Sequence, residues 1–552
     1  QLIAGEEQDE LPQITELLPE GAAPDTIEVE SADEYVDVSA LTMYGSASYR
    51  MYHADGSYET VSADADGKVH NTTGGKVTIV PDYRFEFTNQ ENPTDEHIRG
   101  YVKVNAKNSY NANTGYGLTN AEYSINENGC KPVAGRPIKV DVPAGFYDII
   151  VYRRGGGRAD IYSEGIQIIN NTNSSSSQHR PSGSALMYAP GIYIENGNLD
   201  LTFGNTSGSN ERIASVEIVR VPRKFRKPVI WIAGDSESAT YYPIDENGSD
   251  LDSGKIMMTG FGMQLEKYLS TQYAIANWGQ PSATAGTWKE ECLDAISKRM
   301  QRGDTILIDF GINDAVSGSN RVDIDTAKAN IKEIVDAAKA AGAEPILISP
   351  VYTDKYQHKI YFKYEEAADS NVLKDYAREL GVKFFDLNKY TMLYTEQAKS
   401  ETGDANWRTN NYHVADNLHM TQHSALLDAS LICAALKKMG YQTTDYAYTY
   451  KDLSSIVKEN ETDTNATLRG AESGVTRIYS VAEAEKFIAA NASPEEVFNQ
   501  TWDFSTNQTA ESGSNVPVLS GTAVWDETYQ NIKFDANTRE EGGLQISLNP
   551  SV

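Results

Sequence analysis

Short apolar runs that alternate with helical patterns constrain the fold of this chain more than any other feature. Val229–Ala233 and Thr305–Phe310 are mostly apolar, which is typical of strands buried on both faces of a sheet. Helical patterns follow them, of which Asp325–Gly342, with Asp325 as its N-cap, and Thr421–Met439 are the longest. Strands that alternate with helices predict a parallel sheet covered on both faces. We therefore expect a three-layer α/β domain over residues 226–441.

The region ahead of this domain has the alternation of β structure. Apolar and polar residues alternate in Ile138–Val142 and again in Leu199–Phe203, and glycine-rich turns lie between such segments. Because no amphipathic helix of useful length interrupts residues 84–222, we predict an all-β sandwich there. Residues 27–83 read as a shorter β region, and the basic stretch Arg223–Pro228 separates the sandwich from the α/β domain.

The two ends of the chain are less regular. Residues 1–26 are acidic and have no sustained periodicity, which favours a linker. Residues 442–552 contain a short helical pattern at Ser480–Ala490 and a strand pattern from Trp502 onward, so we expect a linker and a partial β module. Few strands are completed before Val552, which predicts that the sequence is a piece of a longer protein.

The charge balance limits the partners of the chain. With 48 basic and 78 acidic residues, the net charge is 48 − 78 = −30. A field of this sign opposes binding to the phosphates of nucleic acid and to anionic lipid. The apolar runs are far shorter than the roughly 18 to 20 residues that cross a bilayer, so we predict no membrane span. The acidic, tyrosine-rich composition suits a secreted or cell-surface protein.

Metal chemistry has little support in the sequence. The cysteines form neither a CxxC pair nor an even framework, and we expect three buried, free thiols at Cys130, Cys292 and Cys433. His419 and His423 lie four residues apart and could chelate zinc on a helix, with His413 as a third ligand. The Glu of an HExxH motif is missing, and we predict no catalytic cofactor.

Polar residues follow the predicted strands at their carboxyl ends, where an open parallel sheet binds its ligands. The first apolar run leads into Gly234-Asp235-Ser236, and a tight turn there would expose the Ser236 hydroxyl as a nucleophile. The second run leads into Asn313, whose amide can point at a substrate oxygen. Gly279 lies where another strand should end and lets a backbone N–H approach the same oxygen.

The segment Asp416-Asn417-Leu418-His419 precedes the last helix and supplies a base together with a group that orients it. A spacing of three residues lets the carboxylate reach one imidazole nitrogen, which fixes the tautomer and turns the other nitrogen towards a serine. A solvated surface histidine is the alternative interpretation. The order of Ser236, Gly279, Asn313, Asp416 and His419, each at a predicted strand or helix end, favours a serine hydrolase.

These segments resemble the sequence blocks of the SGNH, or GDSL-type, hydrolases. Gly234–Ser236 resembles the first block, Gly279 the second, Gly311–Asp314 the Gly-x-Asn-Asp third block, and Asp416–His419 the Asp-x-x-His fifth block. The resemblance covers residues 226–441 and implies a flavodoxin-like three-layer fold. It also implies that His419, oriented by Asp416, takes the proton of Ser236, while the backbone N–H groups of Ser236 and Gly279 and the amide of Asn313 hold the oxyanion.

Two further stretches, Phe261–Gln264 and Asp309–Ala315, look closest to the rhamnogalacturonan acetylesterase branch of the family. Ile312 stands where that branch usually has His, and Gln280–Ser282 replaces a more basic Gly-Arg-Ser. Sugar contacts could come from tryptophans, which could equally pack in the core, and cations could hold an acidic polysaccharide. The candidates are Trp278, Trp288, Trp407, Arg299, Arg302, Lys355 and Lys359.

The sandwich has a resemblance of its own. Arg84–Leu118 looks like the galactose-binding-like jelly rolls that precede many bacterial polysaccharide esterases and lyases. This resemblance implies either sugar binding or a spacer, and a structural Ca²⁺ that the sequence does not locate. Together the two resemblances predict a secreted bacterial enzyme that removes O-acetyl groups from plant polysaccharide, with pectin first and xylan second. A GDSL lipase or broad arylesterase, and a non-catalytic carbohydrate-binding surface protein, are the alternatives.

Overall fold

A computed structural model gives the fold, in two compact units of residues 1–488 and 489–552. It describes residues 28–448, apart from gaps at 42–47, 90–100, 106–107, 120–123, 127–128, 132–136, 155–159, 164–165, 170–184, 195–196, 205–211, 242–257, 317 and 415, and also residues 478, 480–492, 518–520, 523–526, 531–534 and 543–545. No helix in this part of the chain is long and apolar enough to cross a membrane.

A five-stranded sheet forms the centre of the predicted α/β domain, and all its strand pairs are parallel. The strand order is β19-β18-β20-β21-β24, with β18 at Val229–Gly234, β19 at Ala274–Asn277, β20 at Thr305–Asp309, β21 at Glu344–Ile348 and β24 at Lys383–Phe385. Every residue of β18 and β20 is buried, which confirms the two strands predicted from the apolar runs.

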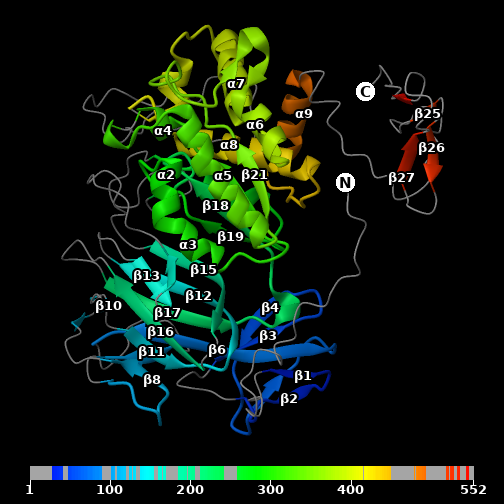
Figure 1. The fold of residues 1–552 in the computed structure, drawn as a ribbon. Helices are drawn as coiled ribbons and strands as arrows, with labels where there is room; N and C mark the ends of the chain where they lie inside the picture. Colours follow the sequence, from blue (N-terminus) through cyan, green and yellow to red (C-terminus); the bar gives the residue numbers. More distant parts are fainter. Residues whose placement is uncertain are drawn as a thin grey trace. The chain divides into compact units, whose positions relative to one another are not determined.

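Helices cover both faces of this sheet (Figure 1). The long ones are α5 (Ile324–Ala340), α6 (Val372–Leu380), α7 (Leu387–Thr402) and α8 (Gln422–Lys438), and the short ones are α1 (Leu265–Tyr268), α2 (Ala285–Trp288), α3 (Asp294–Ser297) and α4 (Ile312–Val316). An apolar core lies on each face of the sheet, and neighbouring residues of β18 belong to different cores. Ile230 packs with α7 and α8, whereas Trp231 packs with α5 and α6. The N-cap of α5 is Asp323 rather than Asp325, because the Asp323 carboxylate accepts the Thr326 N–H.

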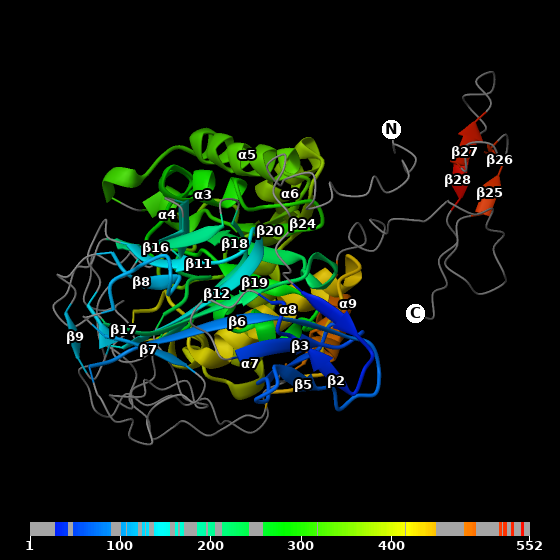
Figure 2. The same cartoon turned by 90° about the horizontal axis from the view of Figure 1, so that it is seen from below.

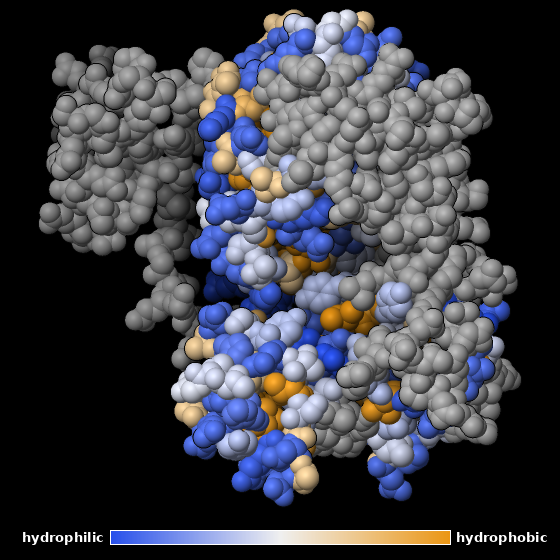
Figure 3. All heavy atoms as spheres, turned by 180° about the vertical axis from the view of Figure 1, so that it is seen from behind, coloured by the Kyte–Doolittle hydropathy of each residue, from blue (hydrophilic) through white to orange (hydrophobic). Residues whose placement is uncertain are grey.

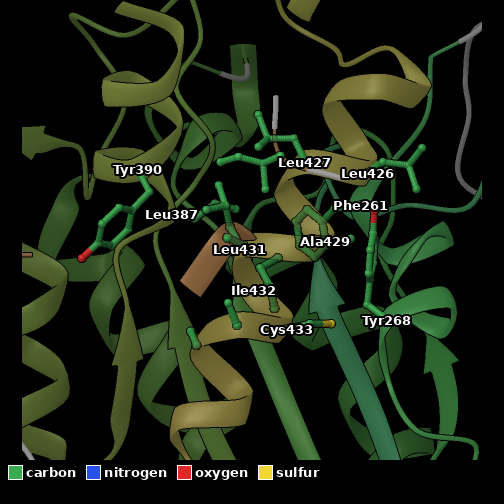
Figure 4. Close-up of a cluster of buried hydrophobic side chains, with 14 of the residues drawn as sticks. Phe261, Tyr268, Leu387, Tyr390, Leu426, Leu427, Ala429, Leu431, Ile432 and Cys433 are labelled. Atoms are coloured by element: carbon green, nitrogen blue, oxygen red, sulfur yellow. The ribbon is translucent and has the colours of Figure 1, made fainter. Parts of the chain in front are cut away.

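Helix α8 is buried almost throughout, which explains why its sequence is apolar over more than one face. In Figure 4 its apolar side chains lie among residues of α1 and α7 and Phe261, which belongs to the short 3-10 helix Phe261–Met263. The helix predicted at Ser480–Ala490 is confirmed as α9 (Val481–Asn491), and its residues up to Ile488 pack in the same core. The helix that follows the Asp416–His419 segment is therefore fixed by the largest apolar cluster of the described residues.

Two large sheets form most of the described strand-rich region, and they share one apolar core; β2 (Tyr35–Asp37) and β5 (Lys68–His70) form a separate pair. The larger sheet has the order β15-β12-β17-β6-β3-β4, and the smaller one β14-β13-β16-β11-β8; Figure 2 shows them as separate layers. The strands of the larger path are β3 (Ser48–Tyr52), β4 (Tyr58–Val61), β6 (Val77–Phe87), β12 (Gly145–Arg154), β15 (Ala185–Ile194) and β17 (Arg212–Arg220). Those of the smaller sheet are β8 (Tyr116–Leu118), β11 (Pro137–Asp141), β13 (Asp160–Ser163), β14 (Ile166–Ile169) and β16 (Asn198–Gly204).

This arrangement is a β-sandwich, while its assignment as a galactose-binding-like jelly roll stays a prediction. Strand β6 runs across the boundary predicted between residues 83 and 84 and pairs with β3 on one side and β17 on the other. The short β region of residues 27–83 and the sandwich of residues 84–222 therefore share one sheet. β6 continues through residues 83 and 84 without a break, and most of its residues are buried.

Two arginines join the sandwich to the α/β domain. The Arg299 guanidinium donates to the carbonyls of Ile168 (3.1 Å) and Pro190 (3.0 Å), both of which belong to sandwich strands. In the basic stretch, the Arg226 guanidinium donates to the Asp304 carboxylate at 3.1 Å. Arg299 is therefore a buried joint between the domains and not one of the cations that could hold a substrate, which corrects the prediction.

The described residues of the second unit form four short strands in two antiparallel pairs. Strand β25 (Val518–Ser520) pairs with β28 (Gly543–Gln545), and β26 (Ala523–Asp526) pairs with β27 (Asn531–Phe534). The sequence predicts the start of a β module at Trp502, which lies outside the described residues.

Candidate active site

The turn that carries Ser236 follows β18 directly. A Cβ at Gly234, the last residue of β18, would lie 2.3 Å from Ser238 Oγ, so the glycine leaves room for this hydroxyl. Asp235 Oδ1 accepts the N–H of Glu237 at 2.9 Å, and the carbonyl of Ser236 accepts the Tyr241 hydroxyl at 2.8 Å. The main chain on both sides of Ser236 is thus held by hydrogen bonds.

Asp416 and His419 make the contact that their spacing predicts. Asp416 Oδ2 lies 2.5 Å from His419 Nδ1, and Asp416 Oδ1 accepts the N–H groups of Leu418 and His419 at 2.9 Å each. Burial alone would raise the pKa of Asp416, but the hydrogen bonds from His419 and Leu418 outweigh it and hold the pKa below its usual range. An ionised Asp416 therefore holds the proton of His419 on Nδ1 and directs Nε2 away from the carboxylate.

The loops of Ser236 and His419 lie together at one end of the sheet. Tyr241, whose hydroxyl donates to Ser236, has its ring edge-on to the His419 imidazole, with 6.4 Å between ring centroids. The segment 259–261 also joins the two loops, because the Thr259 N–H donates to the carbonyl of Met420 and the Phe261 N–H donates to the carbonyl of Glu237. Sequence reasoning missed Tyr241, since no local pattern relates a tyrosine to a histidine 178 positions later.

The two other predicted oxyanion donors lie next to the Ser236 turn. A Cβ at Gly279 would lie 2.5 Å from Ser238 Oγ, so only glycine fits there. Its N–H donates to Asn277 Oδ1 at 3.0 Å, and Asn277 in turn donates to the carbonyl of Ser238 at 2.7 Å. Asn313 donates from Nδ2 to Asp235 Oδ2 at 3.3 Å, and an amide group has a second N–H. Asn277, which the sequence prediction did not include, is thus the residue that ties Gly279 to the turn.

Residues 234–423, which contain all five predicted site residues, match the GDSL-like lipase/acylhydrolase family. This segment is a GDSL-type hydrolase domain. The chain is therefore a carboxylic ester hydrolase.

The chain is similar to several bacterial esterases. The chain is 25 % identical over 365 residues to the uncharacterized esterase YxiM of Bacillus subtilis (strain 168), covering 62 % of this chain and 88 % of YxiM. It is 24 % identical over 231 residues to the rhamnogalacturonan acetylesterase RhgT of the same organism, covering 40 % of this chain and 95 % of RhgT. The crystal structure of YxiM matches with a TM-score of 0.50 at 21 % identity, over 65 % of this chain and 99 % of that chain, which shows a shared fold.

Buried carboxyl groups gather beneath the Ser236 turn of the GDSL-type domain. Burial raises the pKa of Asp235 to about 7, against the hydrogen bond from the Glu237 N–H, and it raises the pKa of Asp314 to about 6, against the hydrogen bond from the Ala285 N–H. Glu237 and Asp309 are fully buried and their pKa values are raised well above the ordinary range by burial. Asp235 and Asp314 each accept a backbone N–H, as expected of residues that brace the turns.

These shifts predict that the fold is more stable at pH 5 than at pH 8. A carboxyl whose pKa is raised in the folded state binds its proton more tightly there than in the unfolded chain, so stability falls as pH rises from about 4 towards 7. We expect the free energy of unfolding in urea to drop by on the order of a few kcal/mol over this range. Asp314→Asn should reduce the drop, whereas Asp336→Asn, at an exposed position, should leave it unchanged. Stability that rises with pH would contradict the prediction.

The other candidate residues divide between the edge of the site and the core. The Lys355 N–H donates to the carbonyl of Asn417 at 3.1 Å, which places this exposed lysine beside the His419 loop, and Lys359 follows on the same loop. Arg302 packs against Gly342, at the end of α5 away from the site. All three candidate tryptophans are buried in the cores, which excludes them from stacking on sugar rings: Trp278, Trp288 and Trp407.

The candidate metal ligands do not form a cluster. His413 is fully buried, and burial lowers its pKa to about 4. In the described part of the chain, no group of three or more His, Cys, Asp or Glu residues is placed to hold a metal ion. All three cysteines are buried and none of them forms a disulfide, as predicted. A structural Ca²⁺ in the sandwich stays a prediction.

Proposed function

We propose that this chain is a serine carbohydrate esterase that removes O-acetyl groups from plant polysaccharide, with the rhamnogalacturonan of pectin as the first substrate and xylan as the second. The observation that carries the proposal is the 2.5 Å contact between Asp416 and His419, on the loop that Tyr241 and residues 259–261 join to the turn of Ser236. Two relatives support the substrate class, since RhgT is a rhamnogalacturonan acetylesterase and YesY a probable one.

The proposed reaction proceeds through an acyl-enzyme. His419 Nε2 takes the hydroxyl proton of Ser236 while Ser236 Oγ attacks the acetyl carbonyl carbon, and the N–H groups of Ser236, Gly279 and Asn313 stabilise the oxyanion. The C–O bond to the sugar then breaks, and the sugar oxygen leaves with the proton from His419. Water attacks the acetyl-serine with the same base, releasing acetate and restoring Ser236. The Gly279 N–H donates to Asn277 Oδ1 in the structure, so to take part in the reaction it has to leave this oxygen and donate to the oxyanion instead.

Local cations support an acidic substrate. Galacturonate is anionic, and a chain of net charge −30 repels it at long range. Lys355 and Lys359 offset this repulsion beside the His419 loop. The proposal places the enzyme outside the bacterial cell, secreted or at the surface, where plant polysaccharide is found, and it requires no cofactor.

Acetate release from three acetylated substrates tests the function. We expect faster release per acetyl group from acetylated rhamnogalacturonan-rich pectin than from acetylated xylan or 4-nitrophenyl acetate. A preference for xylan would move the substrate to the second candidate, and a preference for the aryl ester would favour a broad arylesterase. No release, together with no labelling of Ser236 by an organophosphonate, would favour a non-catalytic carbohydrate-binding protein.

Asn313→Ala should lower kcat by about 10²–10³-fold, because one of the three oxyanion donors is lost while the nucleophile and base remain. KM should change much less, since the oxyanion forms only in the transition state. Steady-state kinetics on 4-nitrophenyl acetate measure both values. Asn320→Ala, on an exposed turn, is the matched control. Equal kcat for Asn313→Ala and the parent enzyme would remove Asn313 from the site.

A further inference from the structure

The two ends of the parallel sheet offer different groups to a ligand. The surface is hollowed between the sandwich and the GDSL-type domain (Figure 3). A pocket of about 110 Å³ there is lined by Val229 and Ala274, the first residues of β18 and β19, and its two arginines, Arg50 and Arg226, already bind carboxylates. The opposite end of the sheet, where Ser236 follows β18, holds a backbone donor to which the proposed reaction gives no role.

The N–H group of Gly279 already has an acceptor. It donates to Asn277 Oδ1 at 3.0 Å. Asn277 is itself fixed, because its Nδ2 donates to the carbonyl of Ser238 at 2.7 Å and to Thr240 Oγ1 at 3.1 Å. A Cβ at Gly262 would lie 2.4 Å from Asn277 Nδ2, so the side chain is also packed on that side. Gly279 therefore reaches an oxyanion only by breaking a well-supported contact.

The other N–H groups of residues 278–285 can be assigned one by one, since each needs an acceptor or solvent. Most of them donate to oxygen atoms in the described structure: Trp278, Gln280, Ala283, Thr284 and Ala285. Pro281 has no N–H group. The remaining residue is Ser282, which is exposed and whose N–H has no partner among the described residues. The segment thus presents one unused backbone donor.

Ser282 has an unusual backbone conformation. Its φ of 67° lies in the left-handed region, which few residues other than glycine adopt, and it is one of four such non-glycine residues in the described part of the chain. The turn is closed by the Ala283 N–H, which donates to the carbonyl of Gln280 at 3.1 Å. Residues held in this region are frequent at active sites, where the surrounding structure fixes them. The N–H of Ser282 is therefore part of a formed turn before any substrate binds.

Two hydrogen bonds fix the segment of Ser282 beside the other proposed oxyanion donors. On one side, the Gln280 N–H donates at 3.0 Å to the carbonyl of Gly234, two residues before the nucleophile. On the other side, the Ala285 N–H donates at 3.0 Å to Oδ1 of Asp314, which directly follows the proposed amide donor. Ser282 lies between these two attachments, so its N–H is held at the same edge of the sheet as the nucleophile.

We propose that the N–H of Ser282 donates to the oxyanion of the tetrahedral intermediate, while the N–H of Gly279 stays on Asn277. This inference rests on the proposed esterase function, for which it names a further catalytic residue. Ser282 acts through its main chain, on a negative charge that forms only in the transition state, so it raises kcat and leaves KM nearly unchanged. Because the turn is already formed, the donor needs no rearrangement during the reaction.

An organophosphonate adduct of Ser236 in the full chain tests this assignment, since its phosphoryl oxygen stands in for the oxyanion. In the crystal structure of the adduct we expect Ser282 N at about 2.7–3.1 Å from this oxygen, with the Gly279 N–H still on Asn277. In ¹⁵N spectra of the protein labelled at serine and glycine, the Ser282 amide proton should move downfield on adduct formation, and that of Gly279 should move less. A phosphoryl oxygen bound by Gly279 and not by Ser282 would overturn the inference.

Two substitutions of Ser282 test the donor in turnover. Ser282→Gly keeps the N–H and accepts a φ of 67°, so kcat should stay close to the parent value. Valine rarely adopts positive φ, so Ser282→Val displaces the N–H and should lower kcat by about 10²-fold with little change in KM. Gly403→Val, at an exposed helix end with the same φ of 67° and open space around it, is the matched control for backbone strain. Parental kcat in Ser282→Val would contradict the assignment.

The outcomes separate this inference from the proposed function. Thermal melting checks that both Ser282 variants fold, and the adduct structure of the parent chain decides the question if the valine variant does not. Labelling of Ser236 with a phosphoryl oxygen that Ser282 does not contact would keep the esterase and remove Ser282 from the site. No labelling and no acetate release from the parent chain would remove the esterase proposal and this inference together.

Discussion

Replacing Ser236 by alanine lowers kcat/KM for acetate release by about 10⁴-fold or more, because the proposed reaction has no other nucleophile. The expected loss is specific to the hydroxyl. The backbone carbonyl of Ser236 still accepts the Tyr241 hydroxyl in the alanine variant, and the N–H of Glu237 still donates to Asp235. The melting temperature should therefore stay close to that of the parent protein.

Steady-state hydrolysis of 4-nitrophenyl acetate and labelling by an organophosphonate measure this effect. The parent enzyme should incorporate one label and lose activity in parallel, and Ser236→Ala should incorporate none. Ser297→Ala is the matched control, since Ser297 is half-buried on α3 and its hydroxyl bonds only to the carbonyl of Asp294 in the described structure. A Ser236→Ala variant that keeps a tenth of the parent activity would exclude Ser236 as the nucleophile.

Replacing Asp416 by asparagine should lower kcat by about 10³–10⁴-fold while the imidazole remains in place. The carboxylate accepts three hydrogen bonds, one from the ring of His419 and two from backbone N–H groups. An amide in its place presents an N–H group to Nδ1 or loses the contact, so the tautomer that leaves Nε2 as a base is no longer favoured. Asp416→Glu, which keeps the charge but moves it, should recover part of the activity.

The pH profile distinguishes an effect on the base from a loss of folding. Because the pKa of Asp416 is held below its usual range, the parent enzyme should show no loss of activity from protonation of this carboxyl between pH 5 and 8. Activity of Asp416→Asn should rise with pH up to alkaline values, where hydroxide replaces the missing base. Asp375→Asn, in an exposed ion pair with Arg378, should behave like the parent. Equal profiles for Asp416→Asn and the parent would contradict the assignment.

The parts of the fold that the sequence predicts correctly depend on local patterns. Strands β18 and β20 are short apolar runs because both faces of the sheet are covered, and such runs are visible without any knowledge of their neighbours. The contact between Asp416 and His419 is equally local, since three residues of spacing and the left-handed Asn417 between them bring the groups together. The same holds for α9, whose buried apolar residues show the helical period.

The parts that the sequence does not predict depend on contacts between distant segments. Asn277 holds the N–H of Gly279, and Tyr241 lies between the loops of Ser236 and His419, but neither residue belongs to a motif. Arg299 looks like a surface cation in the sequence, yet it bonds to two carbonyls from another domain. Continuity of β6 past residue 83 is invisible for a similar reason, because its partners β3 and β17 come from opposite sides of that position.

The bonds of Arg299 also bear on what happens if the hydrolase is separated from the strands that precede it. A fragment starting at residue 226 would retain its parallel sheet and both apolar layers, but the guanidinium would lose both acceptors supplied by Ile168 and Pro190. The ring centres of Trp231 and Trp278 now lie 4.9 Å and 6.0 Å from Arg299 Cζ, and this side of both rings would become exposed to solvent. The sandwich therefore covers a surface of the hydrolase domain that would otherwise be exposed to solvent. The two domains should be expressed together.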